Sequence, residues 1–208
     1  MNENKVVLLF SGGMDSTVSA SMLLAEGMDV IAVGVDYGQR HVVELEYAEA
    51  MASRLNIEFK RINARTMQSM FSYGNELVEG QDKNKQQGAQ CVTTIVPNRN
   101  MFLLALAGSL AMSNNAKNVA IGFNKDDARD YPDCREVFAK AMSNALESVG
   151  IKLLLPTIKM SKNEIVNFSK SLGLQEDSMY SCYAGTVPQC GTCGACVLRK
   201  SVESNDSR

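Results

Sequence analysis

Residues 5–17 read KVVLLFSGGMDST, and this stretch decides the expected fold. KVVLLF (5–10) is a continuous apolar run rich in β-branched residues, which is typical of a strand covered on both faces. Two glycines, a carboxylate and three hydroxyls follow at one turn, before a helical pattern. Such a turn lets backbone N–H groups converge on an oxyanion, and the helix adds the positive end of its dipole. The stretch therefore predicts a phosphate-binding turn.

The side chains of this turn fit a polyphosphate that carries a metal ion. Asp15 would repel a bare phosphate, but it suits a magnesium ion that bridges it to ATP. Neither G-x-x-x-x-G-K-[ST] nor G-x-G-x-x-G is present, so the turn is of neither common nucleotide-binding type. The alternative is a capped strand–helix turn without a ligand. The residues that can approach or donate to phosphate are Ser11, Gly12, Gly13, Ser16 and Thr17.

Strands and helices alternate after this turn. Further apolar runs predict strands at 29–38, 57–62, 118–123 and 151–158, and helical periodicity predicts helices at 14–27, 41–55, 99–114, 135–149 and 161–173. Ser161 and Glu164 have the spacing of a capping box. Strand–helix repetition predicts an α/β fold with a doubly wound parallel sheet. Polar residues 66–95 interrupt the pattern and predict a mobile insertion or lid.

Composition narrows the class of ligand. The 208 residues are 45% hydrophobic and 21% charged, and 21 Lys+Arg against 23 Asp+Glu give a net charge of −2. Proteins that hold long nucleic acids usually show a basic face, and no basic run is present. We therefore expect a small-molecule substrate and no stable nucleic-acid partner. No apolar run has the length of a membrane span or the pattern of a signal peptide, so we expect a soluble, cytoplasmic protein.

Four of the six cysteines crowd the end of the chain. Their spacing, C-x7-C-x2-C-x2-C, can enclose one metal ion tetrahedrally, and four thiolates leave no position open for catalysis. We expect structural Zn²⁺ on Cys182, Cys190, Cys193 and Cys196; an iron–sulfur cluster, free thiols or a disulfide pair are the alternatives. The predicted organisation is an ATP-binding α/β domain over 1–175 and a small zinc-binding module over 176–208.

SGGMDS (11–16) resembles the PP-loop of the ATP pyrophosphatases, which split ATP between the α and β phosphates and adenylate an oxygen. Over almost the whole chain, further segments resemble the 7-cyano-7-deazaguanine synthase family of queuosine biosynthesis. These segments are DYGQRH (36–41), VPNRN (96–100), YPDCREVF (131–138) and CYAG…CGTCGAC (182–196). YPDCR (131–135) with the terminal cysteines is the specific part of the resemblance.

The resemblance implies an adenine nucleotide alpha hydrolase-like fold and an ATP-dependent carbon–nitrogen ligase. It implies that 7-carboxy-7-deazaguanine is adenylated, that ammonia converts it to an amide, and that a second ATP activates the amide oxygen to give the nitrile. Structural zinc, Mg²⁺ with ATP and a homodimer are also expected. The residues expected to bind ATP are Phe10, Ser11, Gly12, Gly13, Asp15, Ser16, Thr17, Asp36 and Tyr37.

The expected catalytic residues are Asp15, Ser16, Arg99 and Lys162. Lys162 stands in the first turn of a predicted helix, where a cation opposes the helix dipole unless a polyphosphate reverses that cost. It also matches a lysine that PP-loop enzymes carry after a late strand, here the one containing Pro156. The alternative is a solvated surface lysine.

The expected substrate-binding residues are His41, Arg99, Asp127, Tyr131, Asp133 and Arg135. A guanine-like base presents donors that suit a carboxylate, with Asp133 the first candidate and Asp127 the second. The substrate carboxylate requires a cation, for which Arg99 and Arg135 lie in the matching segments. The alternatives are helix capping by Asp133, a solvated Arg135 and a structural His41.

Two features depart from the family pattern. Arg129 and Asp130 stand where the synthases usually carry Ser-Gly, and 66–95 lacks the expected proline–glycine pattern. Both departures lie where the substrate could be recognised, so they affect the expected identity of the substrate more than the expected ATP chemistry. The alternatives are therefore a paralogue that adenylates another acceptor, such as a deazaguanine-modifying enzyme or a tRNA sulfurtransferase, and a non-enzymatic nucleotide-binding zinc scaffold.

Overall fold

The computed structural model describes residues 1–71, 96, 98–174 and 176–205, and it contains a parallel five-stranded sheet in the order β3-β2-β1-β4-β5. The strands are β1 (Asn2–Leu9), β2 (Asp29–Asp36), β3 (Glu58–Asn63), β4 (Ala116–Ala120) and β5 (Lys152–Leu154). The doubly wound parallel sheet expected from the sequence is thereby confirmed.

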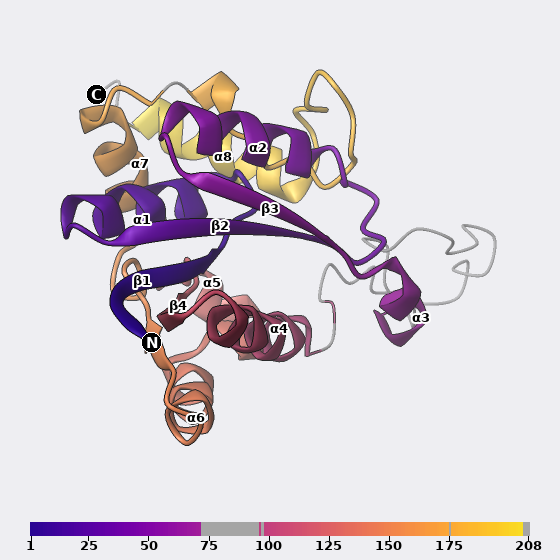
Figure 1. The fold of residues 1–208 in the computed structure, drawn as a ribbon. Coiled ribbons are helices and arrows are strands. Elements are labelled where there is room, and N and C mark those ends of the chain that lie inside the picture. The colour runs from indigo at the N-terminus through magenta and orange to yellow at the C-terminus, as the bar shows by residue number, and fades with distance from the viewer. Residues whose placement is uncertain (72–95, 97, 175, 206–208) are drawn as a thin grey trace.

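Helices cover both faces of the sheet (Figure 1). On one face lie α1 (Met14–Ala25), α2 (Glu44–Arg54), α7 (Lys162–Ser171) and α8 (Gly194–Asn205), and on the other lie α4 (Arg99–Ser113) and α6 (Glu136–Glu147). The shorter elements are η1 (Arg65–Met67), α3 (Gln68–Phe71), α5 (Asp127–Asp130), η3 (Pro132–Cys134) and η4 (Glu176–Ser178).

The apolar run of β1 supplies two separate cores. Val7 and Leu9 join the core on the α4 side, and Val6 and Leu8 join the core on the α1 side. Successive strand residues point to opposite faces of the sheet, and helices cover both faces (Figure 1). All four side chains are therefore buried. This double burial explains why the run is continuous instead of alternating.

Several predicted boundaries change. The strand expected over 151–158 ends at Leu154, two residues before Pro156, which has no N–H for a ladder hydrogen bond. After the last cysteine the chain continues in α8 as far as Asn205. The capping box is confirmed: Glu164 N–H donates to Ser161 Oγ at 3.3 Å, and Ser161 N–H donates to Glu164 Oε2 at 2.7 Å.

The insertion expected at 66–95 begins with η1 and α3, and its residues 72–95 lie outside the described part of the chain.

The strand order places a switch point between β1 and β4. From β1 the chain passes to α1 on one face, whereas α4, which precedes β4, lies on the other face. Ligands of open α/β sheets bind in the crevice that forms at the carboxyl ends of such strands. Among the described helices, none is long and apolar enough to cross a membrane.

Candidate active site

A cavity of about 330 Å³ opens at the carboxyl ends of β1, β2 and β4. Ten of the residues expected at the site from the sequence line it: Phe10, Ser11, Gly13, Asp15, Ser16, Tyr37, His41, Arg99, Asp127 and Lys162. They come from the turns after β1, β2 and β4 and from the N-termini of α1, α4 and α7. The topology thus brings together motifs that are up to 152 residues apart in sequence, as Phe10 and Lys162 are.

The turn after β1 presents the N-terminus of α1 to this cavity. Gly13 is the N-cap of α1 and makes no side-chain cap, so the first N–H groups of the helix have no intrahelical partner. Ser16 Oγ donates to the Gly13 carbonyl at 3.0 Å and lies 3.4 Å from Ser11 Oγ. An oxyanion in the cavity can therefore accept from backbone N–H groups and from a neighbouring hydroxyl.

Asp15 and Lys162 form an ion pair in the same cavity. Lys162 Nζ lies 2.5 Å from Asp15 Oδ2, and Asp15 Oδ1 is buried without a hydrogen-bond partner among the described residues. Burial opposes the charged lysine, yet Asp15 and Asp127 keep the pKa of Lys162 above its usual value. Burial also raises the pKa of Asp127, whose Oδ2 accepts from Asn124 Nδ2 at 2.7 Å. The result is a compact group of one cation and two carboxylates beside the phosphate-binding turn.

Arg99 supplies a second cation from the N-terminus of α4. Burial opposes its charge, but Tyr37 and then Asp133 hold the pKa of Arg99 above its usual value. Burial raises the pKa of Tyr37, and its side chain hydrogen-bonds the Arg99 side chain. Arg99 Nε is buried and has no hydrogen-bond partner in the described part of the chain. A planar guanidinium with unused donors at a cavity wall can bind a carboxylate or a phosphate.

Two of the residues expected to bind ATP support the turn from outside the cavity. Thr17 is fully buried, and its hydroxyl donates to the Gly13 carbonyl at 2.9 Å. Gly12 packs against α2, and its carbonyl accepts from Tyr180 N–H at 3.3 Å. These contacts fix the shape of the turn and leave ligand contact to its other residues.

Asp36 also lies outside the cavity lining. Its carboxylate contacts the guanidinium groups of Arg61 and Arg65 at 3.4 Å and accepts Gly38 N–H at 3.1 Å. Its oxygens thus already have cationic and backbone partners. With these contacts the Asp36 carboxylate stabilises the carboxyl ends of β2 and β3. The structure does not place it where the sequence reading expected a nucleotide contact.

Of the YPDC segment, Cys134 lines the cavity, whereas Asp133 and Tyr131 do not. Asp133 Oδ2 accepts the backbone N–H of Asn100 at 3.2 Å, and Asn100 Nδ2 donates to the Asp133 carbonyl at 3.1 Å. Asp133 thus caps α4, a helix that begins 34 residues earlier, and the N-cap role expected toward its own helix is not observed. Arg135 Nε donates to the Ala128 carbonyl, and Tyr131 hydrogen-bonds the Tyr183 side chain.

The two residues that depart from the family pattern, Arg129 and Asp130, lie in α5. The Arg129 guanidinium is exposed and lies 3.5 Å from Asp126, and neither departing residue lines the cavity. The departures therefore change the outer surface of this segment and leave the cavity wall as it is.

The cysteine segment contributes cavity residues that the sequence reading missed. They are Tyr180, Ser181, Tyr183, Ala195 and Arg199, and they are joined by Met14, Glu44 and Asn100 from other elements. Periodicity gives no sign that a segment distant in sequence folds over the cavity. Glu44 carried a usable signal, since it stands three residues after His41 at a helix start.

The four terminal cysteines form a metal-binding set. Their sulfur atoms all lie within 4.8 Å of one another, which is compatible with a tetrahedral ion. Cys190 N–H donates to Cys182 Sγ at 3.3 Å, and Cys193 N–H donates to Cys190 Sγ at 3.3 Å. The backbone N–H groups of Thr192 and Cys193 lower the pKa of Cys190 to about 6, which favours the thiolate that a metal requires. The donor set fits a structural metal.

Comparison with solved structures shows the fold. The chain is 19% identical to the U34-tRNA thiolase NcsA from Methanococcus maripaludis with its [4Fe-4S] cluster, with a TM-score of 0.56 over 98% of this chain and 68% of that one. It is 20% identical to the NH3-dependent NAD synthetase from Campylobacter jejuni, with a TM-score of 0.54 over 100% of this chain and 77% of that one. The chain therefore shares its α/β fold with these two proteins.

Comparison with sequences shows the family. The model of queuosine biosynthesis protein QueC matches residues 5–204. The chain is 36% identical to the 7-cyano-7-deazaguanine synthase of Hahella chejuensis, covering 98% of this chain and 90% of that protein. It is 35% identical to 7-cyano-7-deazaguanine synthase 2 of Colwellia psychrerythraea, covering 94% and 91%. The chain therefore belongs to the QueC family of queuosine biosynthesis proteins.

Proposed function

We propose that this chain converts 7-carboxy-7-deazaguanine and ammonia to 7-cyano-7-deazaguanine at the expense of two ATP molecules. The observation that carries the proposal is the meeting of the Asp15–Lys162 pair, the open N-terminus of α1 and the buried Arg99 around one cavity. This arrangement supplies a polyphosphate site beside a separate carboxylate site, which adenylation of a carboxylic acid requires.

ATP binding is assigned to the turn after β1. The N–H groups at the start of α1 receive phosphate oxygens, with Ser11 and Ser16 adding hydroxyl donors. Asp15 Oδ1, which is buried and unpartnered among the described residues, fits an oxygen ligand of Mg²⁺. The Lys162 ammonium neutralises charge that develops on the α-phosphate and the departing pyrophosphate.

Substrate binding is assigned to the other wall. Arg99 holds the substrate carboxylate toward the α-phosphate, because its guanidinium retains unused donors at the cavity. Asp127 accepts hydrogen bonds from the donor edge of the deazaguanine base. We assign this role to Asp127 and not to Asp133, because Asp133 caps α4 and does not line the cavity.

The chemistry follows from the poor reactivity of a carboxylate. Its oxygen attacks the α-phosphorus of ATP, pyrophosphate leaves, and the acyl adenylate gains AMP as a leaving group. Ammonia displaces AMP to give the amide. The amide oxygen then attacks a second ATP at the same turn, and departure of AMP leaves the nitrile.

Zn²⁺ is the metal proposed for the four-cysteine set. Zn–S bonds of about 2.3 Å place tetrahedral sulfurs about 3.8 Å apart, within the observed spread. The ion holds the cysteine segment, proposed as the module over 176–208 beside the ATP-binding domain over 1–175. We also propose a homodimer, since Met101 and Met112 on α4 are about half exposed, and a cytoplasmic location, where ATP and reduced thiols are present.

The test combines the purified, zinc-loaded protein with ATP, Mg²⁺, ammonium and 7-carboxy-7-deazaguanine and follows the products by mass spectrometry. Nitrile and AMP are expected, and both are expected to disappear in Asp15→Ala. Glu46→Gln, which alters an exposed carboxylate of α2, serves as the matched control. AMP without nitrile would point to another acceptor, and a folded protein that leaves ATP intact would point to a nucleotide-binding scaffold.

A further inference from the structure

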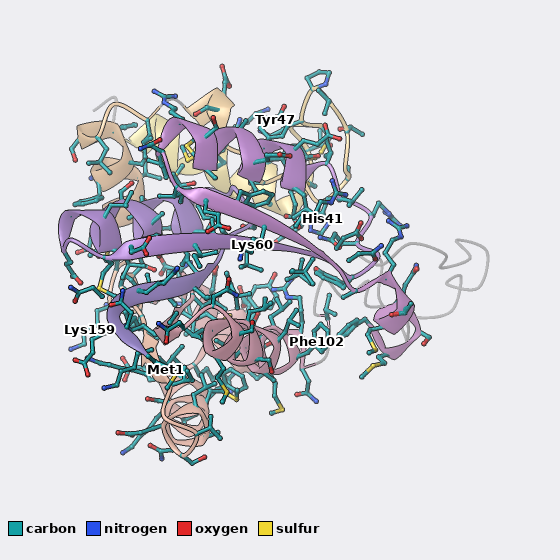
Figure 2. The ribbon with its side chains drawn as sticks, viewed as in Figure 1. Met1, His41, Tyr47, Lys60, Phe102 and Lys159 are labelled. Carbon is teal, nitrogen blue, oxygen red and sulfur yellow. The ribbon has the colours of Figure 1, made fainter. Side chains whose placement is uncertain are left out.

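His41 is the one histidine of the sequence, and it lines the cavity. It lies in the segment that connects β2 with α2 (Figure 2). Its side chain is 7% exposed, and its Nδ1 atom is buried with no hydrogen-bond partner among the described residues. A buried nitrogen without a partner destabilises the empty site, so a ligand that supplies the missing hydrogen bond would recover this cost.

A chain of buried polar groups ends at this imidazole. Gln39, which is fully buried, accepts Tyr37 N–H at 2.9 Å and donates to the Val35 carbonyl at 3.0 Å. The same Gln39 amide donates to Glu44 Oε1 at 3.0 Å, and Glu44 Oε2 lies 3.5 Å from His41 Nε2. The carboxylate is therefore fixed from behind and faces one nitrogen of the ring.

This arrangement selects a tautomer. A carboxylate beside Nε2 favours the form that carries its proton on Nε2, which leaves the lone pair on Nδ1. The Tyr183 ring lies 6.0 Å from the imidazole, measured between ring centroids, and burial raises the pKa of that phenol. The groups that contact His41 from α2 and from the cysteine segment are thus an acid and a neutral phenol, and both leave Nδ1 available as a proton acceptor.

The proposed reaction needs such an acceptor. When ammonia displaces AMP, the C–N bond forms, the bond from carbon to the AMP oxygen breaks, and one proton must leave nitrogen. When the activated amide collapses, the C–O bond to AMP breaks, the triple bond is completed, and two further protons leave the same nitrogen. Three protons therefore pass from one atom to a base and then to water, without an oxidant or reductant.

We propose that His41 Nδ1 accepts these protons and that Glu44 positions the imidazole by binding Nε2–H. The assignment rests on the proposed function, since it concerns the nitrogen of that reaction. The other cavity groups are committed elsewhere: Asp15 pairs with Lys162, and Asp127 accepts from Asn124. Burial raises the pKa of Cys134 to about 12, which keeps this thiol protonated.

The first experiment separates adenylation from proton transfer in His41→Gln. Exchange of labelled pyrophosphate into ATP, dependent on 7-carboxy-7-deazaguanine, reports carboxylate adenylation, which moves no proton from nitrogen. This exchange is expected to stay within about threefold of wild type, whereas amide formation falls about 100- to 10,000-fold. Nitrile formation from the supplied amide, with ATP and without ammonia, is expected to fall by a similar factor.

Added imidazole provides the corresponding rescue in His41→Gly. Recovery of amide and nitrile formation, with pyrophosphate exchange unchanged by imidazole, is expected if the ring acts only as a base. Equal losses in exchange and in amide formation would overturn the assignment, and so would wild-type rates in His41→Gln. Absence of nitrile from the wild-type protein would instead refute the proposed function, so the two failures are distinct.

A spectroscopic experiment tests Glu44 without reference to activity. In protein that carries no affinity tag, ¹⁵N-histidine labelling reports one imidazole, because the chain has one histidine. The wild type is expected to show a protonated Nε2 and an unprotonated Nδ1, and Glu44→Gln is expected to shift the proton toward Nδ1. Glu46→Gln, on the exposed side of α2, should leave the tautomer unchanged. A wild-type imidazole that is already protonated on Nδ1 would overturn the proposal.

Discussion

Gly12→Ala is expected to destabilise the protein through a contact that the sequence alone does not show. Gly12 has φ of +71°, and a Cβ atom built there would lie 2.5 Å from the backbone nitrogen and 2.6 Å from the Cα of Ala48 in α2. Real Cβ atoms do not approach so closely, and the obstructing atoms belong to a helix backbone that cannot rotate away. The turn or α2 must therefore move.

The expected cost has two parts. A left-handed backbone costs a residue with a Cβ atom about 1–2 kcal/mol. Forcing an extra methyl into a packed interface costs about 1–3 kcal/mol more. The sum, about 2–5 kcal/mol, is a large share of the 5–15 kcal/mol that stabilises a typical domain. Loss of ATP binding should accompany it, because Gly12 lies within the phosphate-binding turn.

Gly27→Ala is the matched control. Gly27 also has a positive φ, +77°, but a Cβ atom there would have nothing within 4 Å, so only the backbone cost applies. Urea unfolding of both zinc-loaded variants should show a similar slope of about 2 kcal/mol/M, with the midpoint of Gly12→Ala about 0.5–1.5 M below that of Gly27→Ala. Equal midpoints for the two variants would refute the packing argument.

Three further outcomes are expected. Lys162→Met should lower pyrophosphate exchange about 100-fold or more, because it removes the cation 2.5 Å from Asp15, whereas Lys159→Met, an exposed lysine before the same helix, should not. Metal removal by a chelator should weaken ATP binding in calorimetry as well as stability, since Tyr180 N–H binds the Gly12 carbonyl; unchanged ATP affinity in metal-free protein would contradict this. Asp127→Asn should raise the unfolding temperature near pH 7.5 and lose this advantage near pH 4, because a carboxyl whose pKa is raised by folding destabilises the protein as pH rises through that pKa; a constant difference across this range would show that Asp127 does not titrate in this way.

Local patterns predicted those parts of the fold that depend on neighbours in sequence. The capping box at Ser161 and Glu164 requires residues three apart, and the buried strands require only continuous apolar runs. Gly13, Asp15 and Lys162 reach one cavity because parallel strands end at one edge, a rule that sequence reading can apply. These features could be predicted because each depends on periodicity or on topology that periodicity implies.

Asp133 illustrates what local patterns leave open. Its position before a helix predicts an N-cap for that helix, but it accepts the N–H of Asn100 and caps α4 instead. Asp36 is a similar case, since Arg61 and Arg65 reach it only after β2 and β3 pair. Several carboxylates could accept from the same donors. Which of them does so depends on distances that only the folded chain sets, and local sequence patterns do not give these distances.

The cysteine segment links the metal-binding set to the candidate active site. Tyr180 N–H binds the carbonyl of Gly12, and a Cβ atom at Gly185 would lie 2.6 Å from the carbonyl oxygen of Arg40, the residue before His41. The segment therefore contacts the phosphate-binding turn through Tyr180, and through Gly185 it contacts the backbone next to the proposed base, His41. Because Cys182 lies between these two contacts, a metal bound there restrains both. Removing the metal should then impair adenylation and proton transfer together, whereas His41→Gln should impair only the latter.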